Sequence, residues 1–462
     1  MQLDNLYSIS THRDPAHRRR GTVITASTQP AVRIEDIFAQ LRLSPRLICV
    51  LALCVAIATG EGYDVQSMAL AAPLLAKSWG LTRGQVGLLL TASVSGILLG
   101  SVLLAPQGDR RGRRPVGLAG LLLGAIFATA SAFATELHTL LPIRILAGLG
   151  VGCAMPNIFA IAMETAPSRW RIVAVVAVSC GYPLGSAVGG LVASHLAGHG
   201  YAGVFLVGGA IIAVNFVLGT VWLPESPSFL AARRPSETRR LLVSLGASLA
   251  DDVTFVAPPE RPRSSVAALF TPARRTTTIL LWVLNFTNMT LVFFFISWLP
   301  SLLAYRGLAN SASLSVTSLF SGAGVVGGIS MAFAMRRLIP PTVLSVAYVF
   351  AGASVIALAM LPVSGSAFLI SIAISGATIL GSQFCLIALV NHYYPPEIRV
   401  SGAGYAIGAG RLGALLAPVA GGILLSLVSA VQWVFVLTAL PALIALGVVL
   451  TLRRTRTIAQ AA

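Results

Sequence analysis

Charged residues are scarce in this sequence of 462 residues: they make up 10% of the chain, whereas hydrophobic residues make up 56%. A typical soluble domain has about 25% charged residues. The shortage of charge therefore excludes an ordinary soluble enzyme or binding domain. Since the chain needs lipid as its solvent, we interpret the sequence as that of a membrane protein.

Cysteine is also rare, and its positions exclude two further kinds of site. The five cysteines all fall within apolar runs, at no spacing typical of a disulfide framework or a metal site. They are Cys49, Cys54, Cys153, Cys180 and Cys385. No kinase-type or hydrolase motif is present either. We therefore expect that the chain is not an enzyme and has neither a metal nor a cofactor, and we interpret the cysteines as packing residues.

Long apolar runs are what the sequence does contain. They recur from Leu47 to Leu452, and each is long enough to cross a hydrocarbon core of about 30 Å as an α-helix. The predicted spans are residues 47–76, 85–105, 116–134, 139–162, 172–194, 203–223, 277–304, 312–334, 342–362, 365–390, 401–427 and 430–452. The predicted fold class is an all-α integral membrane protein with twelve transmembrane helices.

Basic residues outnumber acidic ones by 32 to 15, so a nucleic-acid partner has to be considered. An even number of crossings places both termini on one side of the membrane, and most Lys and Arg residues lie in the segments on that side. The opposite loops hold only Lys77, Arg83 and Arg306. The positive-inside rule therefore predicts cytoplasmic termini in a bacterial inner membrane, with the lipid bilayer and no nucleic acid as a partner.

The long basic loop after the sixth span divides the chain into halves of similar hydropathy. This pattern predicts two pseudo-symmetric six-helix bundles, as in many transporters. The loop is rich in proline and is interpreted as a linker with a short helix around residues 237–249, while the N-terminal tail lacks an apolar core and is expected to be neither a signal peptide nor a domain. The predicted segments are a tail at 1–46, bundles at 47–223 and 277–452, a middle loop at 224–276 and a C-terminal tail at 453–462.

Two carboxylates, Glu61 and Asp64, lie near the middle of the first predicted span. Charged groups are costly inside a membrane and usually have a function there. Their spacing of three puts both on one helix face, where mutual repulsion and desolvation suit one of them to carry a proton. The alternative is a structural ion pair with a neighbouring helix.

Two arginines also fall within predicted spans. Arg144 must find an anion, either one of the helix-one carboxylates or a substrate carboxylate, unless it extends to the membrane surface. Arg411 lies about 15 Å into the eleventh span, and no second-half span contains an acidic residue. An anionic substrate is therefore the simplest partner for Arg411. The amides of Asn285, Asn288 and Gln383 either bind substrate or join helices.

The loop between the second and third spans reads APQGDRRGRR from Ala105 to Arg114. Asp109 at a helix end can pair with arginine and with a neighbouring helix terminus, which would act as a charge latch. The spacing of Asp109, Gly112 and Arg113 resembles the signature loop of the major facilitator superfamily, with Ala105 where that family usually has glycine. The alternative is a plain positively charged loop.

Nearly the whole chain resembles one branch of that superfamily, the aromatic acid:proton symporters. The matching segments are EGYD at 61–64, LPESP at 223–227, SWLP at 297–300, YPPEIR at 394–399 and GRLGA at 410–414. The first of these looks most like the hydroxyphenylpropionate-type members. It has glutamate where the branch has aspartate, and the second-half counterpart of the signature loop is reduced to a Met-Arg-Arg sequence without an acid.

The resemblance implies a proton-coupled transporter of the major facilitator fold that imports an aromatic carboxylate, such as hydroxyphenylpropionate or hydroxybenzoate, by alternating access. We expect it to function as a monomer. The residues expected to act are Glu61, Asp64 and Arg144 in proton coupling; Arg411, Asn285, Gln383, Tyr63, Tyr182 and Tyr405 in substrate binding; and Asp109, Gly112, Arg113 and Arg399 in gating. For any single aromatic residue, packing is the alternative.

Three other functions fit parts of this pattern. A proton-driven exporter of drugs or organic ions would share the signature loop and Arg144, although the helix-one acids and Arg411 favour uptake of an anion. A membrane sensor would need an output domain, which neither the tail nor the middle loop resembles. A passive channel would not need paired carboxylates in the membrane.

Overall fold

The structure is a computed structural model that describes residues 31–33, 37–38, 41, 44–196, 200–245, 254–256, 266–272, 274–363, 365–394, 398–428 and 430–461. In these ranges, 12 helices are long and apolar enough to cross a membrane. The predicted all-α fold with twelve transmembrane helices is therefore confirmed, and the chain is a multi-pass membrane protein.

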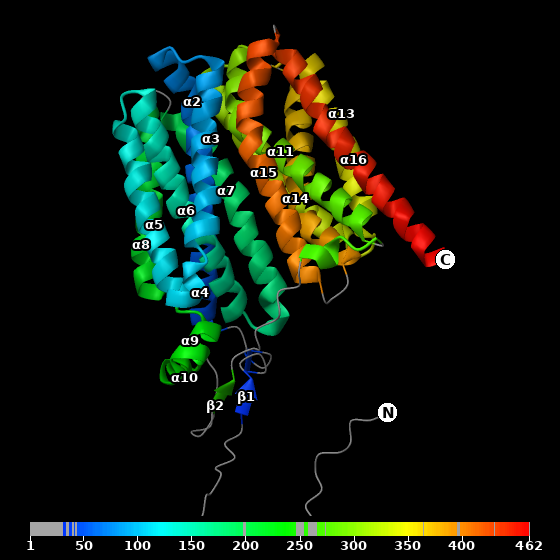
Figure 1. Ribbon diagram of the computed structural model, residues 1–462. Helices are drawn as coiled ribbons and strands as arrows, with labels where there is room; N and C mark the ends of the chain where they lie inside the picture. The colour runs from blue at the N-terminus through cyan, green and yellow to red at the C-terminus, as the bar shows by residue number, and fades with distance from the viewer. Residues whose placement is uncertain are drawn as a thin grey trace, which may run out of the picture.

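The 12 long helices, six from each half of the chain, form two groups. The groups stand side by side (Figure 1). The first group is α2 (Pro45–Trp79), α3 (Arg83–Leu99), α5 (Arg113–Ala130), α6 (Leu137–Thr165), α7 (Arg171–Leu196) and α8 (Gly200–Trp222). The second group is α11 (Arg275–Tyr305), α12 (Asn310–Ala334), α13 (Pro340–Met360), α14 (Ser366–Tyr393), α15 (Arg399–Leu427) and α16 (Val431–Ala461). A π-helical turn at Gly100–Leu104 continues α3 into the short helix α4 (Gln107–Arg111).

Local capping explains where the first spans begin and end. The hydroxyl of Ser44 accepts a hydrogen bond from the Leu47 N–H at 3.3 Å, and Gly80 ends α2 with a φ of +62°, which favours glycine. Thr82 and Gln85 form a capping box at the start of α3. Because these caps lie outside the apolar runs, α2 and α3 each begin two residues before the predicted span.

The two halves meet at the end of the bundle that holds the start of α3 and the end of α15, which we call the far end. The Arg83 guanidinium donates to the Leu425 carbonyl, and a Cβ at Gly87 would lie 3.0 Å from the Pro418 carbonyl oxygen. Apolar side chains such as Trp298, which is fully buried, fill this contact. The far end is therefore closed.

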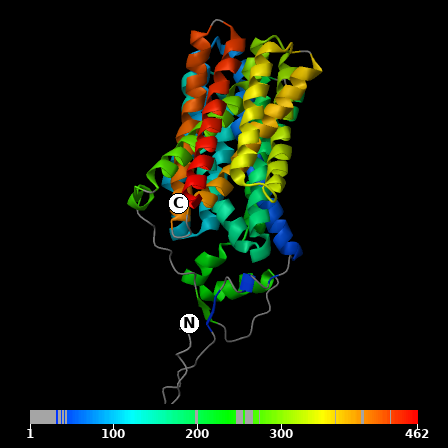
Figure 2. The same cartoon turned by 90° about the vertical axis from the view of Figure 1, so that its right-hand side faces the viewer.

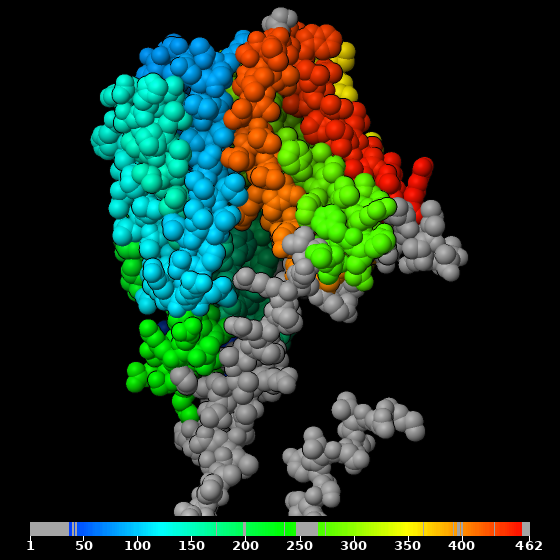
Figure 3. Space-filling view, viewed as in Figure 1, coloured from blue at the N-terminus to red at the C-terminus, as the bar shows by residue number. Residues whose placement is uncertain are grey.

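The opposite end of the bundle, which we call the linker end, holds the starts of α2 and α11. On α15, Gly404 and Gly408 are exposed there, and a Cβ at either position would meet no atom within 4 Å. The space-filling view shows α15 against α3 in its upper part and a recess between the halves lower down (Figure 3). The bundle is therefore open toward the linker end.

Parts of the tail and the middle loop pack together beneath the first half (Figure 2). The strands β1 (Ala31–Arg33) and β2 (Thr254–Val256) pair in parallel, and α9 (Pro227–Arg233) and α10 (Pro235–Ser244) lie beside them in the loop. The apolar cluster here consists of Ile37, Phe38, Leu41, Leu47, Ala231, Leu242 and Leu245. Neither the tail nor the loop has enough apolar residues to form a core alone, so nothing in the sequence indicated this shared cluster. Of the helix predicted around residues 237–249, residues 246–249 lie outside the described part of the chain.

Candidate functional site

Asp64 and Arg144 form an ion pair between α2 and α6. The Arg144 Nη1 donates to the Asp64 carboxylate at 3.1 Å, and Nη2 donates to the Asp64 backbone carbonyl at 3.0 Å. The third guanidinium nitrogen, Nε, donates to the hydroxyl of Ser93 in α3 at 3.0 Å. The two side chains are 1% and 0% exposed. Arg144 therefore has an anionic partner inside the bundle, and the alternative of extension to the membrane surface is excluded in this structure.

The ring of Phe205, in α8, completes the surroundings of Arg144. Its centroid lies 5.3 Å from the guanidinium carbon, within the range of a cation–π contact. Arg144 thus contacts α2, α3 and α8 from its position in α6. A buried ion pair of this kind becomes strongly destabilising when one partner is removed, because the other charge is left without compensation.

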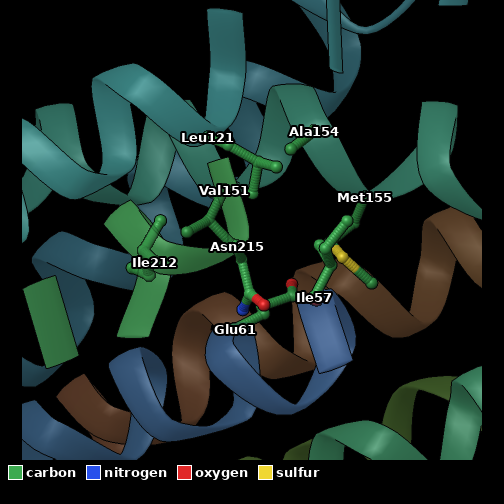
Figure 4. A pocket seen from close by; sticks show the side chains of 8 residues that line it. All are labelled: Ile57, Glu61, Leu121, Val151, Ala154, Met155, Ile212 and Asn215. Atoms are coloured by element: carbon green, nitrogen blue, oxygen red, sulfur yellow. The ribbon is translucent and has the colours of Figure 1, made fainter. Parts of the chain in front are cut away.

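Glu61 shares the helix face of Asp64 but has different surroundings. It lines a pocket inside the first half whose other residues are apolar apart from Asn215 (Figure 4). The pocket residues are Ile57, Glu61, Leu121, Val151, Ala154, Met155, Ile212 and Asn215. Within the described part of the chain, Glu61 has no cationic nitrogen within 4.0 Å. The two carboxylates, which sequence analysis treated as one pair, therefore differ: Asp64 pairs with Arg144, whereas Glu61 has no ion pair among the described residues.

Arg411 reaches from α15 across to the other half. Its Nη1 donates to the hydroxyl of Ser101 in the π-helical turn that follows α3. Its charge and that of Glu61 attract each other, but the described residues place no carboxylate within 4.0 Å of it. Gly404 and Gly408 lie on the same face of α15, at i−7 and i−3, so Arg411 stands at the inner limit of the recess.

Two of the three second-half amides, Asn288 and Gln383, join helices. Asn288 in α11 donates to the Gln383 side-chain oxygen in α14 at 2.7 Å, and the Tyr348 hydroxyl in α13 donates to Asn288 at 2.9 Å. Asn285 donates to the Leu281 carbonyl of its own helix at 2.8 Å. The contacts of Asn288 and Gln383 favour the alternative of helix joining, although the N–H donors of the Gln383 amide have no acceptor among the described residues.

The predicted aromatic residues lie in three different places. The Tyr63 hydroxyl donates to the Val204 carbonyl at 3.1 Å and the ring is 1% exposed, so Tyr63 joins α2 to α8. Tyr405 is 42% exposed and shares a face of α15 with the exposed Leu412 and Leu416. It points away from Arg411, and its ring contacts Trp282 instead.

Tyr182 is the aromatic residue that the structure brings close to the acids. It lies in α7 where that helix crosses α2, since a Cβ at Gly62 would overlap the Tyr182 carbonyl oxygen. Its hydroxyl is buried and has no hydrogen-bond partner among the described residues. The Tyr182 hydroxyl interacts electrostatically with the carboxylates of Glu61 and Asp64.

The signature loop is held by two acids that sequence analysis did not select. Arg113 pairs with Glu164 at the end of α6, while its contact with the exposed Asp109 is long, at 3.4 Å. The backbone N–H groups of Arg113 and Arg114 donate to one oxygen of Glu225, at 2.8 and 3.1 Å. Glu225 therefore caps the start of α5, a helix-terminus role that the sequence suggested for Asp109.

Gly112 is needed where the loop turns into α5. Its φ is +106°, a conformation that L side chains rarely adopt, and a Cβ there would overlap a Glu225 carboxylate oxygen. The only sequence signal for Glu225 was its place in the LPESP segment. Arg399 begins α15, but its side chain lies outside the described part of the chain.

Comparison with known proteins places the chain in a family. The model of the Major Facilitator Superfamily matches residues 50–406, which is more than half of the sequence. The chain belongs to this superfamily. Because the superfamily consists of transporters, the chain is a transporter and not an enzyme.

The relatives of this superfamily member include several aromatic acid transporters. A gallate transporter of Pseudomonas putida is 33% identical, over 85% of this chain and 89% of that protein. The 4-hydroxybenzoate transporter PcaK of Pseudomonas aeruginosa is 32% identical, over 91% and 96%. The 3-(3-hydroxy-phenyl)propionate transporter of Escherichia coli is 31% identical, over 83% and 88%. The predicted relationship to aromatic acid transporters is therefore confirmed.

Solved structures of other superfamily members share the fold. A bacterial homologue of the lysosomal transporter Spinster, in an inward-facing and occupied conformation, matches with a TM-score of 0.70 over 89% of this chain and 98% of that one, at 15% identity. The xylose transporter XylE of E. coli, in an inward-open conformation, matches with a TM-score of 0.68 over 87% and 94%, at 15% identity. These matches confirm the major facilitator fold.

Proposed function

We propose that this transporter imports a hydroxylated aromatic carboxylate together with at least one proton by alternating access across a bacterial inner membrane. The observation that carries the proposal is Arg411, a half-buried cation between the halves that has no carboxylate within 4.0 Å among the described side chains. A buried guanidinium keeps its charge and requires an anion. The gallate, 4-hydroxybenzoate and 3-(3-hydroxyphenyl)propionate carried by the relatives all supply one.

Arg411 suits a carboxylate for geometric reasons as well. One of its terminal nitrogens donates to Ser101 on the opposite half, which leaves the other donors of the planar guanidinium for two parallel hydrogen bonds to a carboxylate. A carboxylate bound there would lie between the halves at the inner limit of the recess. It would also weaken the attraction between Arg411 and Glu61.

Glu61 is the carboxylate that we assign to the proton. Asp64 already has Arg144 as its counter-ion and needs no proton to remain buried. Glu61 lies in a largely apolar pocket, and among the described residues its favourable charge partner is the more distant Arg411. When a substrate carboxylate engages Arg411, a proton on Glu61 removes the remaining buried charge, and the loaded carrier becomes easier to reorient.

The Tyr182 hydroxyl is a candidate contact for a ring substituent. A buried hydroxyl without a partner costs about 1–3 kcal/mol, and a substrate hydroxyl would remove that cost. Gln383 offers a second polar contact from the opposite half, because its amide N–H groups have no acceptor among the described residues. Asp64 and Arg144 keep α2 and α6 in register, and we assign them a positioning role beside Glu61, which carries the proton, and no role in substrate binding.

In the predicted orientation the linker end faces the cytoplasm, and the structure corresponds to an inward-open carrier. Closure of that end would bring the signature loop near the start of α15. Gly112, Arg113 and Arg399 would then gate the cytoplasmic side, with Glu164 and Glu225 holding the loop in shape. The exposed Asp109, whose contact with Arg113 is long, would then be able to exchange it for a partner on the opposite half.

Uptake of labelled aromatic carboxylates by cells that express the protein tests this function. Accumulation of 4-hydroxybenzoate, gallate or hydroxyphenylpropionate that collapses with a protonophore is the expected result. Arg411→Ala is expected to raise KM by about tenfold or more, because a charge-assisted hydrogen bond contributes about 1.5–3 kcal/mol. Arg411→Lys is expected to retain part of the uptake, since it keeps the charge but loses the planar fork.

The matched control is Arg240→Ala, which removes an equal charge from an exposed site in the middle loop. Its uptake is expected to equal that of the parent. If no aromatic acid accumulates, or if Arg411→Ala transports as well as Arg240→Ala, the assignment is wrong. Resistance of the expressing cells to drugs or organic cations would then support export.

A further inference from the structure

A chain of buried polar side chains crosses the contact between the halves two residues beyond Asp64. Gln66 of α2 donates through Nε2 to the Ile296 carbonyl of α11 at 3.2 Å, and its Oε1 accepts from Ser186 of α7 at 2.6 Å. Ser321 of α12 donates to the Ser186 hydroxyl at 3.2 Å. Gln66, Ser186 and Ser321 are each at most 1% exposed. We call these three side chains and the Ile296 carbonyl the polar clasp.

The bonds of the polar clasp divide into one within a half and two between halves. Gln66 and Ser186 both belong to the first half, and their mutual bond leaves one donor, the Gln66 amide, and one acceptor, the Ser186 oxygen. The second half supplies the complementary acceptor at Ile296 and the complementary donor at Ser321. Each half therefore presents a preformed site that matches the other.

The surroundings of the polar clasp are apolar and tightly packed. The fully buried Phe295 lies next to Ile296 in the chain and stacks on Phe320, with 5.6 Å between the ring centroids. One turn of α7 beyond Ser186, a Cβ at Gly190 would overlap the Ser318 hydroxyl of α12. Polar groups buried in such a place are costly unless all of them are satisfied, so their pairing depends on close contact of the halves.

The polar clasp also adjoins the coupling site along α2. Ser67 donates to the Asp64 carbonyl at 2.6 Å, and the same carbonyl accepts from Arg144. Residues 64–67 thus hold the Arg144 contact and the clasp in one helical turn. A shift of this turn relative to α6 would move Gln66 relative to Ile296.

We propose that the polar clasp is a latch that holds the far end shut and sets the equilibrium between the inward-open and outward-open states. Gln66 and Ser186 act in it as positioning residues and do not contact the substrate. Separation of the halves breaks the bonds to Ile296 and Ser321, and water replaces them when the far end opens. Hydrogen bonds suit a reversible contact, because water can replace each partner when the halves separate. Apolar surface has no such replacement, and its exposure to water costs free energy.

Labelling of cysteine reporters in the full-length protein tests the latch. On a background without the five native cysteines, Ser318→Cys reports the far end, where Ser318 is 6% exposed against Gly190. Gly408→Cys reports the linker end, where a side chain meets open space. The ratio of the two labelling rates with a small water-soluble thiol reagent measures the balance of states, and neither reading needs substrate.

Gln66→Leu and Ser321→Ala are expected to speed labelling at Ser318→Cys and slow it at Gly408→Cys, a shift in the ratio of about fivefold to tenfold for each lost bond. Ser321→Thr keeps the hydroxyl and is expected to restore the parental ratio. Ser354→Ala is the matched control, because Ser375 donates to Ser354 at 2.8 Å in an equally buried pair that lies within the second half alone.

An unchanged ratio in both Gln66→Leu and Ser321→Ala overturns the latch, as does an equal shift in Ser354→Ala. Faster labelling at both reporters would indicate general loosening, and it overturns the latch as well. Ser321→Ala is a small change, so the test does not depend on whether Gln66→Leu folds. Because the readout is independent of substrate, failure of the latch and failure of the proposed aromatic-acid uptake are separate results.

Discussion

The two halves of the transporter differ in where their charged side chains lie. The first half places Glu61, Asp64 and Arg144 inside its bundle and neutralises two of them in an ion pair. Within the second-half spans, Arg411 faces the other half, while the polar groups around Asn288 satisfy one another. The first half therefore neutralises charge within its own bundle, whereas the second half places its charge at the contact between the halves.

The largest expected effect is on the ion pair of the first half. Arg144→Met leaves Asp64 buried without its counter-ion, which is expected to cost about 3–5 kcal/mol of folding free energy. Thermal unfolding of the purified protein in detergent measures the loss. The double variant Asp64→Asn with Arg144→Met removes both charges and is expected to unfold at a higher temperature than Arg144→Met alone; equal temperatures would argue against the pair.

The second prediction separates Glu61 from Asp64. Glu61→Gln is expected to fold as the parent does, because the described residues give Glu61 no ion pair to lose, but it should no longer accumulate substrate against a gradient, with or without a protonophore. Uptake driven by a substrate gradient alone is expected to persist. Asn215→Ala, at the other polar position in the pocket, is the control and is expected to keep proton dependence. Proton-driven accumulation by Glu61→Gln would return the coupling role to Asp64.

The third prediction concerns the neutral polar network of the second half. Asn288→Ala leaves Tyr348 and Gln383 without their partner and is expected to cost about 1–3 kcal/mol, less than the loss of Arg144. The KM for aromatic acids is expected to remain within about twofold if the network only joins helices. Unfolding temperature and uptake kinetics on the same variant decide between a structural role and a substrate-binding one.

The smallest expected effect tests substrate contact from the first half. Tyr182→Phe removes only a hydroxyl and is expected to raise KM about threefold to tenfold for hydroxylated acids, as a neutral hydrogen bond contributes about 0.5–1.5 kcal/mol. Competition by unsubstituted benzoate is expected to stay unchanged. Tyr63→Phe loses a hydroxyl bonded to Val204 and serves as the control. An equal effect of Tyr182→Phe on hydroxylated acids and on unsubstituted benzoate would show that Tyr182 does not recognise the ring substituent.

Sequence patterns predicted the fold because membrane spans depend on a local property. Each span is a run of apolar residues matched in length to the bilayer, so composition alone locates α2 or α11 to within a few residues. The rarity of charge in such runs likewise selected Glu61, Asp64, Arg144 and Arg411 without knowledge of their neighbours. The signature loop was recognised from spacing that a single segment contains.

Partners of these residues depend on helices far apart in the chain, and only the tertiary structure decided them. Only two residues separate Glu61 from Asp64, yet Glu61 lines an apolar pocket and Asp64 pairs with Arg144. From sequence, Asp109 was the acid expected to interact with a neighbouring helix terminus. In the structure Glu225 accepts hydrogen bonds from the start of α5 instead, because α8 returns the chain to the loop. The polar clasp joins Gln66 to Ser186 and Ser321 through helix crossings. Sequence determines which groups lie in the membrane, because burial in lipid is a matter of composition, whereas packing determines which of them meet.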